Sequence, residues 1–358
     1  ILNKRKDFKK QTKISVISSI TSGIIGIGLA FWGFGYWSLA IKTLSQNLIR
    51  VILLYALSEF RPKLLYSIES LKELFGFGIK LLVAGLIDTI YKNIYKLIIG
   101  RYFSSSELGY YSRAEQFHNL PSANLNSTTQ RVTYPVLANL TKDDSKLKAG
   151  YKKLIKLLFF ITSVTMLLMI INAKEIIIIL VGQKWAPAVP YLQILCISGA
   201  LYPLHALNLN ILNVKGRSDL FLKLEIIKKI IVIPIIIIGI HYGMIVMLWG
   251  MVFNSFFAYF LNSLFSAKLI SYPSYEQLLD ILPTFIHIAI MAVLAFAIGQ
   301  VAPSNLFLSL ILKTSVALGY LFTAGYLFKI PEFLELKDLL KEQIKLHFGI
   351  LKLKKADA

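Results

Sequence analysis

Charged side chains recur along one side of an otherwise apolar segment, where they could bind an anion within a membrane. In LFGFGIKLLVAGLIDTIYKNIYKLIIG, residues 74–100, Asp88, Lys92 and Lys96 fall within about 80° of arc on an α-helix. Lys80 lies about another 80° round the same helix. Asp88 and Lys92 are one turn apart, so they can neutralise each other until an anionic ligand arrives. For Lys80 and Lys96 a second interpretation stays open, in which both side chains snorkel to the membrane interfaces.

A second segment, residues 107–138, has the length of a membrane helix but is rich in Arg, Asn, Gln, Ser and Thr. Arg113 and Arg131 are five helical turns apart, so they share an azimuth but stand about 27 Å apart along a straight helix. The polar side chains between them occupy two faces, with Gln116, Asn124 and Ser127 on one and Glu115, Asn119 and Asn126 on the other. Pro121 is expected to kink the helix between its halves.

These residue types indicate binding rather than catalysis. Amide and hydroxyl groups suit sugar hydroxyls, whereas Arg and Lys suit phosphate or uronate groups. A helix that is polar on two faces is therefore expected to line a hydrated cavity. An alternative stays open, in which the amides bond to neighbouring helices and the arginines snorkel to the interfaces.

The sequence lacks the motifs of enzymes and nucleotide-binding proteins. Its five histidines are scattered without ligand spacing, and it contains neither GxGxxG nor GxxxxGK[ST]. The single cysteine, Cys196, lies in a hydrophobic run and is expected to be a small core residue. We therefore expect no catalytic residue, no metal site and no cofactor.

Composition shows what must position the polar segments. The 358 residues are 56% hydrophobic and only 16% charged, whereas soluble domains are about 25% charged. Apolar runs of about 20 residues, enough to cross the hydrocarbon core as helices, recur along the chain. The fold class expected is an all-α polytopic membrane protein with ten spans, at 12–32, 36–57, 71–99, 107–138, 150–171, 186–212, 219–240, 243–268, 282–300 and 305–328.

The distribution of Lys and Arg supports this arrangement and orients it. These residues are concentrated in alternate segments, at 1–13, 58–72, 139–156, 213–229, 266–281 and 329–358, and are nearly absent from the other connections. The positive-inside rule then places both ends of the chain in the cytoplasm. The asymmetry exists only if the polar segment 107–138 crosses the membrane. The net charge of +20 is thus explained by topology, and no nucleic-acid partner is expected.

Several short pieces occur in an order typical of one family. They are GFGYWSL (33–39), RP (61–62), LFGFG (74–78), IGRYFSSSELGYYSRA (99–114), LP (120–121), TYPVL (133–137) and GQKW (182–185). Together they resemble the bacterial polysaccharide-transport flippases, which handle O-antigen, exopolysaccharide and teichuronic acid units. These belong to the multidrug/oligosaccharidyl-lipid/polysaccharide exporter superfamily. The resemblance covers almost the whole chain except its final tail.

The resemblance implies a fold of fourteen helices, arranged as two six-helix lobes and a final pair. The chain, which opens on ILNKRKDFKKQ without an initiator Met, is then expected to be a fragment lacking the first four helices. Its expected parts are the end of the N-terminal lobe (1–57), a cytoplasmic linker (58–70), the C-terminal lobe (71–268), the final pair (282–328) and a basic cytoplasmic tail (329–358).

The same resemblance implies transport of an undecaprenyl-pyrophosphate-linked oligosaccharide across the bacterial cytoplasmic membrane, by alternating access through a cationic cavity. The implied partners are this substrate, membrane lipids, an H+ or Na+ counter-ion, and a polysaccharide polymerase with its chain-length machinery. Asp88 and Glu115, the deep carboxylates of the two polar segments, are the expected coupling residues.

Two other functions compete with this hypothesis. A cation-coupled multidrug exporter would share the fold, but its cavity would need acids and aromatic rings for cationic drugs. A membrane glycosyltransferase resembling an O-antigen ligase would need a substantial outer loop bearing Arg or His. The longest outer connection expected here is only residues 172–186.

Overall fold

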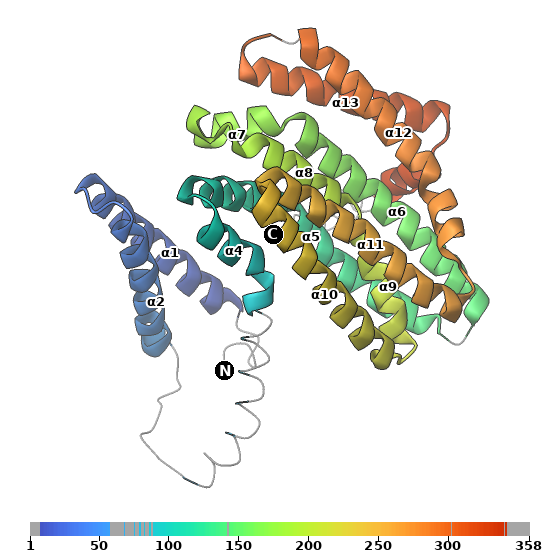
Figure 1. Ribbon diagram of the computed structural model, residues 1–358, viewed down its shortest axis with the longest axis horizontal. Coiled ribbons are helices and arrows are strands. Elements are labelled where there is room, and N and C mark those ends of the chain that lie inside the picture. The colour runs from blue at the N-terminus through green and yellow to red at the C-terminus, as the bar shows by residue number, and fades with distance from the viewer. Residues whose placement is uncertain are drawn as a thin grey trace, which may run out of the picture. The chain divides into compact units, whose positions relative to one another are not determined.

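The computed structural model of the chain is built from helices, and Figure 1 shows their arrangement. It describes residues 8–57, 89–141, 143–301 and 303–339, together with isolated positions at 68, 75, 79, 82, 86 and 341. The contacts divide the chain into two units, residues 1–86 and 87–358.

The part of unit 1 that the structure describes continuously, residues 8–57, is an antiparallel helical hairpin. Its helices are α1 (Phe8–Phe31) and α2 (Trp37–Leu57). The turn between them contains Gly33 and Gly35, both with positive φ, a conformation that glycine adopts without steric cost. Along the hairpin, the Gln46 amide donates to the Ser19 hydroxyl at 3.0 Å.

Unit 2 holds the remaining helices described. These are α4 (Ile94–Tyr102), α5 (Ser105–Asn139), α6 (Asp144–Ile171), α7 (Ala173–Val181), the 3-10 turn η1 (Gln183–Trp185), α8 (Ala188–Ala200), α9 (Tyr202–Val214), α10 (Ser218–Tyr242), α11 (Met244–Ile270), α12 (Ser274–Val301) and α13 (Leu306–Leu327). Residues 331–339 are also helical. Helix α5 packs against α6, α8 and α9, and α12 lies along the far side of α6 (Figure 1).

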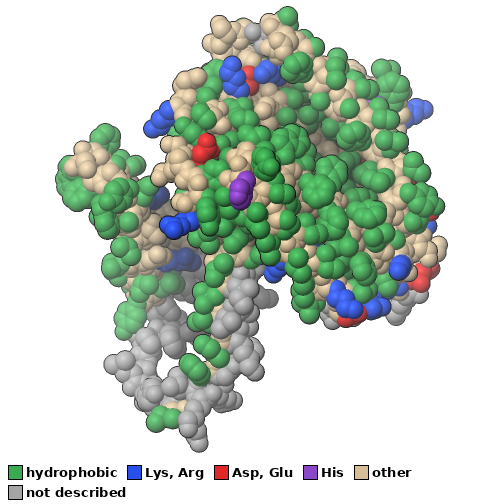
Figure 2. Space-filling model, in the orientation of Figure 1, with side chains coloured by type: hydrophobic (Ala, Val, Ile, Leu, Met, Phe, Trp, Pro, Cys, Tyr) green, Lys and Arg blue, Asp and Glu red, His purple; other side chains and the backbone are tan. Residues whose placement is uncertain are grey.

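Seven helical segments among the described residues are long and apolar enough to cross a membrane. They are Thr12–Phe31, Trp37–Ala56, Asp144–Ile171, Ala188–Val214, Met244–Ile270, Ser274–Val301 and Leu306–Leu327. Figure 2 shows one face of the protein, covered largely by hydrophobic side chains. The predicted all-α polytopic fold is confirmed.

The other three predicted spans have different outcomes. Segments 107–138 and 219–240 are the continuous helices α5 and α10. Most of 71–99 lies outside the described residues. Among the seven matched segments, the one at predicted span 186–212 consists of two helices, α8 and α9, which meet at Leu201 just before Pro203.

Ion pairs join several connections between helices at one end of unit 2. The pairs are Lys215–Asp144 (2.6 Å), Lys148–Glu276 (3.3 Å), Lys152–Asp280 (2.8 Å) and Lys153–Glu335 (2.9 Å). They join the end of α9 and the starts of α6 and α12 to residues 331–339. At the other end of α5, Glu107 accepts a hydrogen bond from Tyr191 at the start of α8. Helix α5 therefore runs from one end of unit 2 to the other, as the charge asymmetry requires of segment 107–138.

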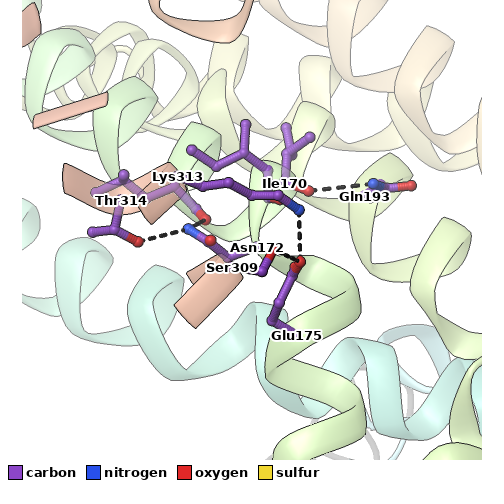
Figure 3. A network of polar contacts seen from close by, with 9 residues as sticks. Ile170, Asn172, Glu175, Gln193, Ser309, Lys313 and Thr314 are labelled. Atoms are coloured by element: carbon purple, nitrogen blue, oxygen red, sulfur yellow. Dashed lines mark hydrogen bonds and ion pairs between the residues drawn. The ribbon is translucent and has the colours of Figure 1, made fainter. Parts of the chain in front are cut away.

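A buried ion pair attaches α13 to the junction of α6 and α7 (Figure 3). Lys313 of α13 pairs with Glu175 of α7 at 2.6 Å, and their side chains are 14% and 3% exposed. The Ser309 hydroxyl donates to the same carboxylate oxygen at 2.8 Å. Between α6 and α7, the Asn172 amide donates to the Thr314 hydroxyl at 3.0 Å. Neither α7 nor this pair was expected from the sequence, which indicated only a connection at 172–186.

The buried pair predicts a strong energetic coupling. Glu175→Gln or Lys313→Met alone should lower the free energy of unfolding by about 3 to 5 kcal/mol, because each leaves one buried charge without its partner. The double variant should recover most of this loss. Unfolding of the purified protein in SDS measures all three variants.

Lys174→Met is the matched control, because Lys174 is the exposed neighbour of Glu175 on α7. It should leave stability nearly unchanged. Fully additive losses in the double variant would contradict an energetic role for the pair.

Candidate functional site

Helix α5 has a polar face that the protein leaves exposed. We define the open face of α5 by four exposed residues, which are Gln116, Asn124 and Ser127 of one predicted polar face and Asn119 at the edge of the other. The opposite side is buried against α6, α8 and α9, through residues such as Ala114, Phe117 and Thr133. Because exposed amides on a membrane helix are unfavourable in contact with lipid, the open face must meet water or another polar surface.

Some polar side chains of α5 bond to their own helix. The Asn124 amide donates to the Leu120 carbonyl at 2.8 Å, and the Ser127 hydroxyl donates to the Asn124 carbonyl at 3.0 Å. The Ser122 hydroxyl donates to the His118 carbonyl. These bonds surround Pro121, through which α5 continues without ending. These bonds to the backbone use some of the side-chain hydrogen-bond donors of α5, but Asn124 and Ser127 remain exposed.

The alternative of bonding between helices is also realised, on the buried side. The Asn210 amide of α9 donates to the Thr133 hydroxyl of α5 at 2.8 Å, and both residues are buried. His118 lies against Gly199 of α8, where an added Cβ would come within 2.5 Å of its Nε2 atom. Its Nδ1 atom is 3.3 Å from the Asn119 amide oxygen. Thus the two sides of α5 differ, since one forms contacts between helices and the other is exposed.

An ion pair connects α4 to α5. Lys96 Nζ lies 2.5 Å from the Glu115 carboxylate, and the two side chains are 38% and 20% exposed. Glu115 precedes the open face by one residue, so this pair stands at its edge. Two predicted site residues are thereby brought together.

Arg113 contacts both the open face and the connection before α8. Its guanidinium donates to the Gln116 amide oxygen at 2.8 Å. The same group lies over the indole ring of Trp185, with Cζ 5.0 Å from the ring centroid. Among the described residues, Arg113 forms no ion pair with a carboxylate. Trp185 was not among the predicted site residues, because nothing in its spacing from residue 113 predicts this contact.

The remaining predicted site residues are only partly described. Lys80 and Asp88 lie outside the described residues, as does the side chain of Arg131. Lys92 is exposed and helical, but Asn93 (φ −105°, ψ 9°) forms a turn before α4 begins. The arc predicted to hold both Lys92 and Lys96 assumes ideal helical geometry between them. Asn93 departs from that geometry.

The described groups around the open face are ones that bind ligands. Around the open face, cationic groups (Lys96 and Arg113) stand beside a row of amides and a hydroxyl. Guanidinium and ammonium groups bind oxyanions, and amides bind hydroxyl groups. An anionic ligand rich in hydroxyls matches this combination.

A solved membrane-protein structure has a similar fold. The structure is similar to a solved structure described as "Lipid II flippase MurJ, inward closed conformation", with a TM-score of 0.65 over 88% of this chain and 67% of the other. Sequence identity is 17%, so the similarity defines the fold alone.

Sequence similarity defines the family. The polysaccharide biosynthesis protein family matches residues 1–190, more than half of the chain, and the chain belongs to that family.

Named relatives cover part of the chain. It is 28% identical over 233 residues to teichuronic acid biosynthesis protein TuaB of Bacillus subtilis, covering 62% of this chain and 46% of the relative. It is 27% identical to lipopolysaccharide biosynthesis protein WzxC of Escherichia coli, covering 57% and 43%. It is also 27% identical to succinoglycan biosynthesis transport protein ExoT of Rhizobium meliloti, covering 57% and 41%. The chain spans less than half the length of these relatives.

The Lys96–Glu115 pair predicts that reversing both charges preserves stability. Lys96→Glu alone, or Glu115→Lys alone, should place like charges side by side and lower the free energy of unfolding by about 1 kcal/mol. The double swap restores opposite charges and should regain the melting temperature of the unaltered protein. Thermal unfolding in detergent, with the exposed-site variant Lys184→Glu as control, measures this. A double swap less stable than both single variants would show that the two side chains are not paired.

Proposed function

We propose that this protein is a flippase that moves a lipid-linked oligosaccharide across the cytoplasmic membrane for surface polysaccharide biosynthesis. The observation that carries the proposal is the open face of α5, an exposed row of amides and a hydroxyl on a helix that crosses unit 2. Membership of the polysaccharide biosynthesis family and the flippase-like fold support the same function. An undecaprenyl pyrophosphate carrier would supply the anion, and its sugars would supply the hydroxyl groups.

The charges around α5 favour an anionic sugar-lipid over a cationic drug. A multidrug exporter would need carboxylates and aromatic rings free to meet a cation. Here the Glu115 carboxylate is paired with Lys96, and the Trp185 ring is covered by Arg113. The multidrug function is therefore the less favoured alternative. An enzyme is less favoured still, because the relatives include a transport protein by name and the site offers binding groups.

The Lys96–Glu115 pair suggests how transport would be coupled to an ion. An arriving oxyanion would compete for the Lys96 ammonium and release the Glu115 carboxylate. The released carboxylate would then bind H+ or Na+, so substrate binding and ion binding would be linked at one pair. Asp88, Lys92, Lys80 and Arg131 belong to the same proposed pathway, with Asp88 and Lys92 forming a second pair of this type. We also propose interaction with a polysaccharide polymerase and its chain-length machinery, which would use the exported units.

Deleting the gene should abolish the surface polysaccharide and cause lipid-linked repeat units to accumulate in the membrane. The unaltered gene should restore export, whereas the double swap Lys96→Glu with Glu115→Lys should reduce it at least tenfold at normal protein levels. The reason is that the swap keeps the ion pair but moves the cation that meets the substrate. Extracted lipid-linked oligosaccharide and surface polysaccharide are quantified together.

Two outcomes would count against the proposal. Normal polysaccharide in the deletion strain, with lost efflux of cationic dyes, would favour the multidrug exporter. Full export by the double swap would assign the pair a purely structural role.

The orientation proposed places both chain ends in the cytoplasm. With Cys196 replaced by Ala, single cysteines at Ser105 and Lys184 should react with an impermeant maleimide in intact cells. A cysteine at Lys146, whose side chain is 73% exposed, should react only after the cells are opened. Labelling at residue 146 but not at 105 in intact cells would reverse the proposed orientation.

A further inference from the structure

The connection after α7 holds one tryptophan in a fixed place. Helix α7 ends at Val181, and Gly182 has φ +97°, a backbone conformation that favours glycine. The following 3-10 turn, η1, brings Trp185 to the start of α8. Its backbone N–H donates to the Gly182 carbonyl at 3.0 Å. The backbone of this connection thus places residue 185 at the start of α8.

That ring packs on the first turns of α5. Tyr110 meets it edge to face, with ring centroids 6.0 Å apart and planes 86° apart. The ring also lies beside Gly109, where an added Cβ would be 3.7 Å away. Arg113 lies three residues after Tyr110 and four after Gly109, on the same side of the helix. Trp185 therefore contacts the part of α5 from which Arg113 extends.

The contacts of Arg113 leave its charge available. A guanidinium has five N–H donors in one plane, and Gln116 accepts from one of them. Stacking on an indole uses the flat face of the guanidinium and leaves its edges able to bind two oxygens of one anion. The nearby Glu107 carboxylate accepts from Tyr191.

We propose that Trp185 is a positioning residue that holds Arg113 in a fixed orientation to bind an oxyanion of the substrate. This inference rests on the proposed flippase function and adds a residue to it. The oxyanion is a phosphate of the lipid carrier or a carboxylate of an acidic sugar, since both present two oxygens to the guanidinium edge. Stacking limits the rotation of Arg113 before the substrate arrives, so less conformational entropy is lost on binding.

The test is a mutant cycle between Trp185 and Arg113, measured as transport of lipid-linked oligosaccharide in proteoliposomes. Trp185→Leu should raise the half-saturating substrate concentration about five- to thirtyfold, as expected for a lost cation–π contact of about 1 to 2 kcal/mol. The maximal rate should change little. Trp185→Phe, which keeps an aromatic face, should show a smaller effect. Trp249→Leu, a change at an exposed tryptophan on α11, is the matched control.

The cycle separates positioning from simple packing. In an Arg113→Gln background, Trp185→Leu should add almost nothing to the half-saturating concentration. An equal effect of Trp185→Leu with and without the arginine would overturn the proposal. So would a fully active Trp185→Leu variant.

A binding measurement keeps this inference distinct from the flippase proposal. In a protein whose only tryptophan is Trp185, the fluorescence emission of this residue is measured while undecaprenyl pyrophosphate or, separately, glucuronate is added. A saturable change that requires Arg113 supports the proposal, and the active probe tells whether phosphate or carboxylate is the oxyanion. If neither probe changes the emission, the proposal is overturned. A response without any transport would overturn only the flippase function.

Discussion

A polar group inside a membrane must find its partner within the protein, and the arrangement of unit 2 depends on this constraint. Helix α5 carries more polar side chains than any helix facing lipid could tolerate. Helices α6, α8 and α9 cover one of its sides, where Thr133 bonds to Asn210. The other side bonds partly to its own backbone and is otherwise exposed. A single helix thus combines a packed side and an exposed polar side.

Polar side chains next to the proline of α5 bond to the backbone of their own helix. Pro121 has no N–H to donate, so the Phe117 carbonyl one turn earlier loses its helical partner. The side chains of Ser122 and Asn124 donate to other carbonyls of this turn, those of His118 and Leu120. Some of the residues that make the segment appear specialised for a ligand therefore also stabilise the helix. Position on the open face, rather than polarity alone, distinguishes the two roles.

The sequence predicted the helices well because hydropathy and alternating charge are properties of single segments. It also predicted that Lys96, Arg113 and Glu115 belong to one region. It could not predict their partners, because these depend on how separate helices pack. Trp185 is far from Arg113 in the chain, and Glu175 is 138 residues from Lys313. The turn at Asn93 has a different cause, because a single residue departs from helical geometry within an otherwise helical pattern.

The ion pair on α13 has a consequence for how the protein is made. A lysine in the middle of a membrane helix costs up to about 2.5 to 3.5 kcal/mol on insertion. Lys313 recovers this cost only when the Glu175 carboxylate is already beside it. During synthesis the carboxylate emerges from the ribosome first, and the ammonium follows more than a hundred residues later. Insertion of α13 is therefore favoured by the earlier assembly of α6 and α7, so the order of biogenesis matches the direction of the chain.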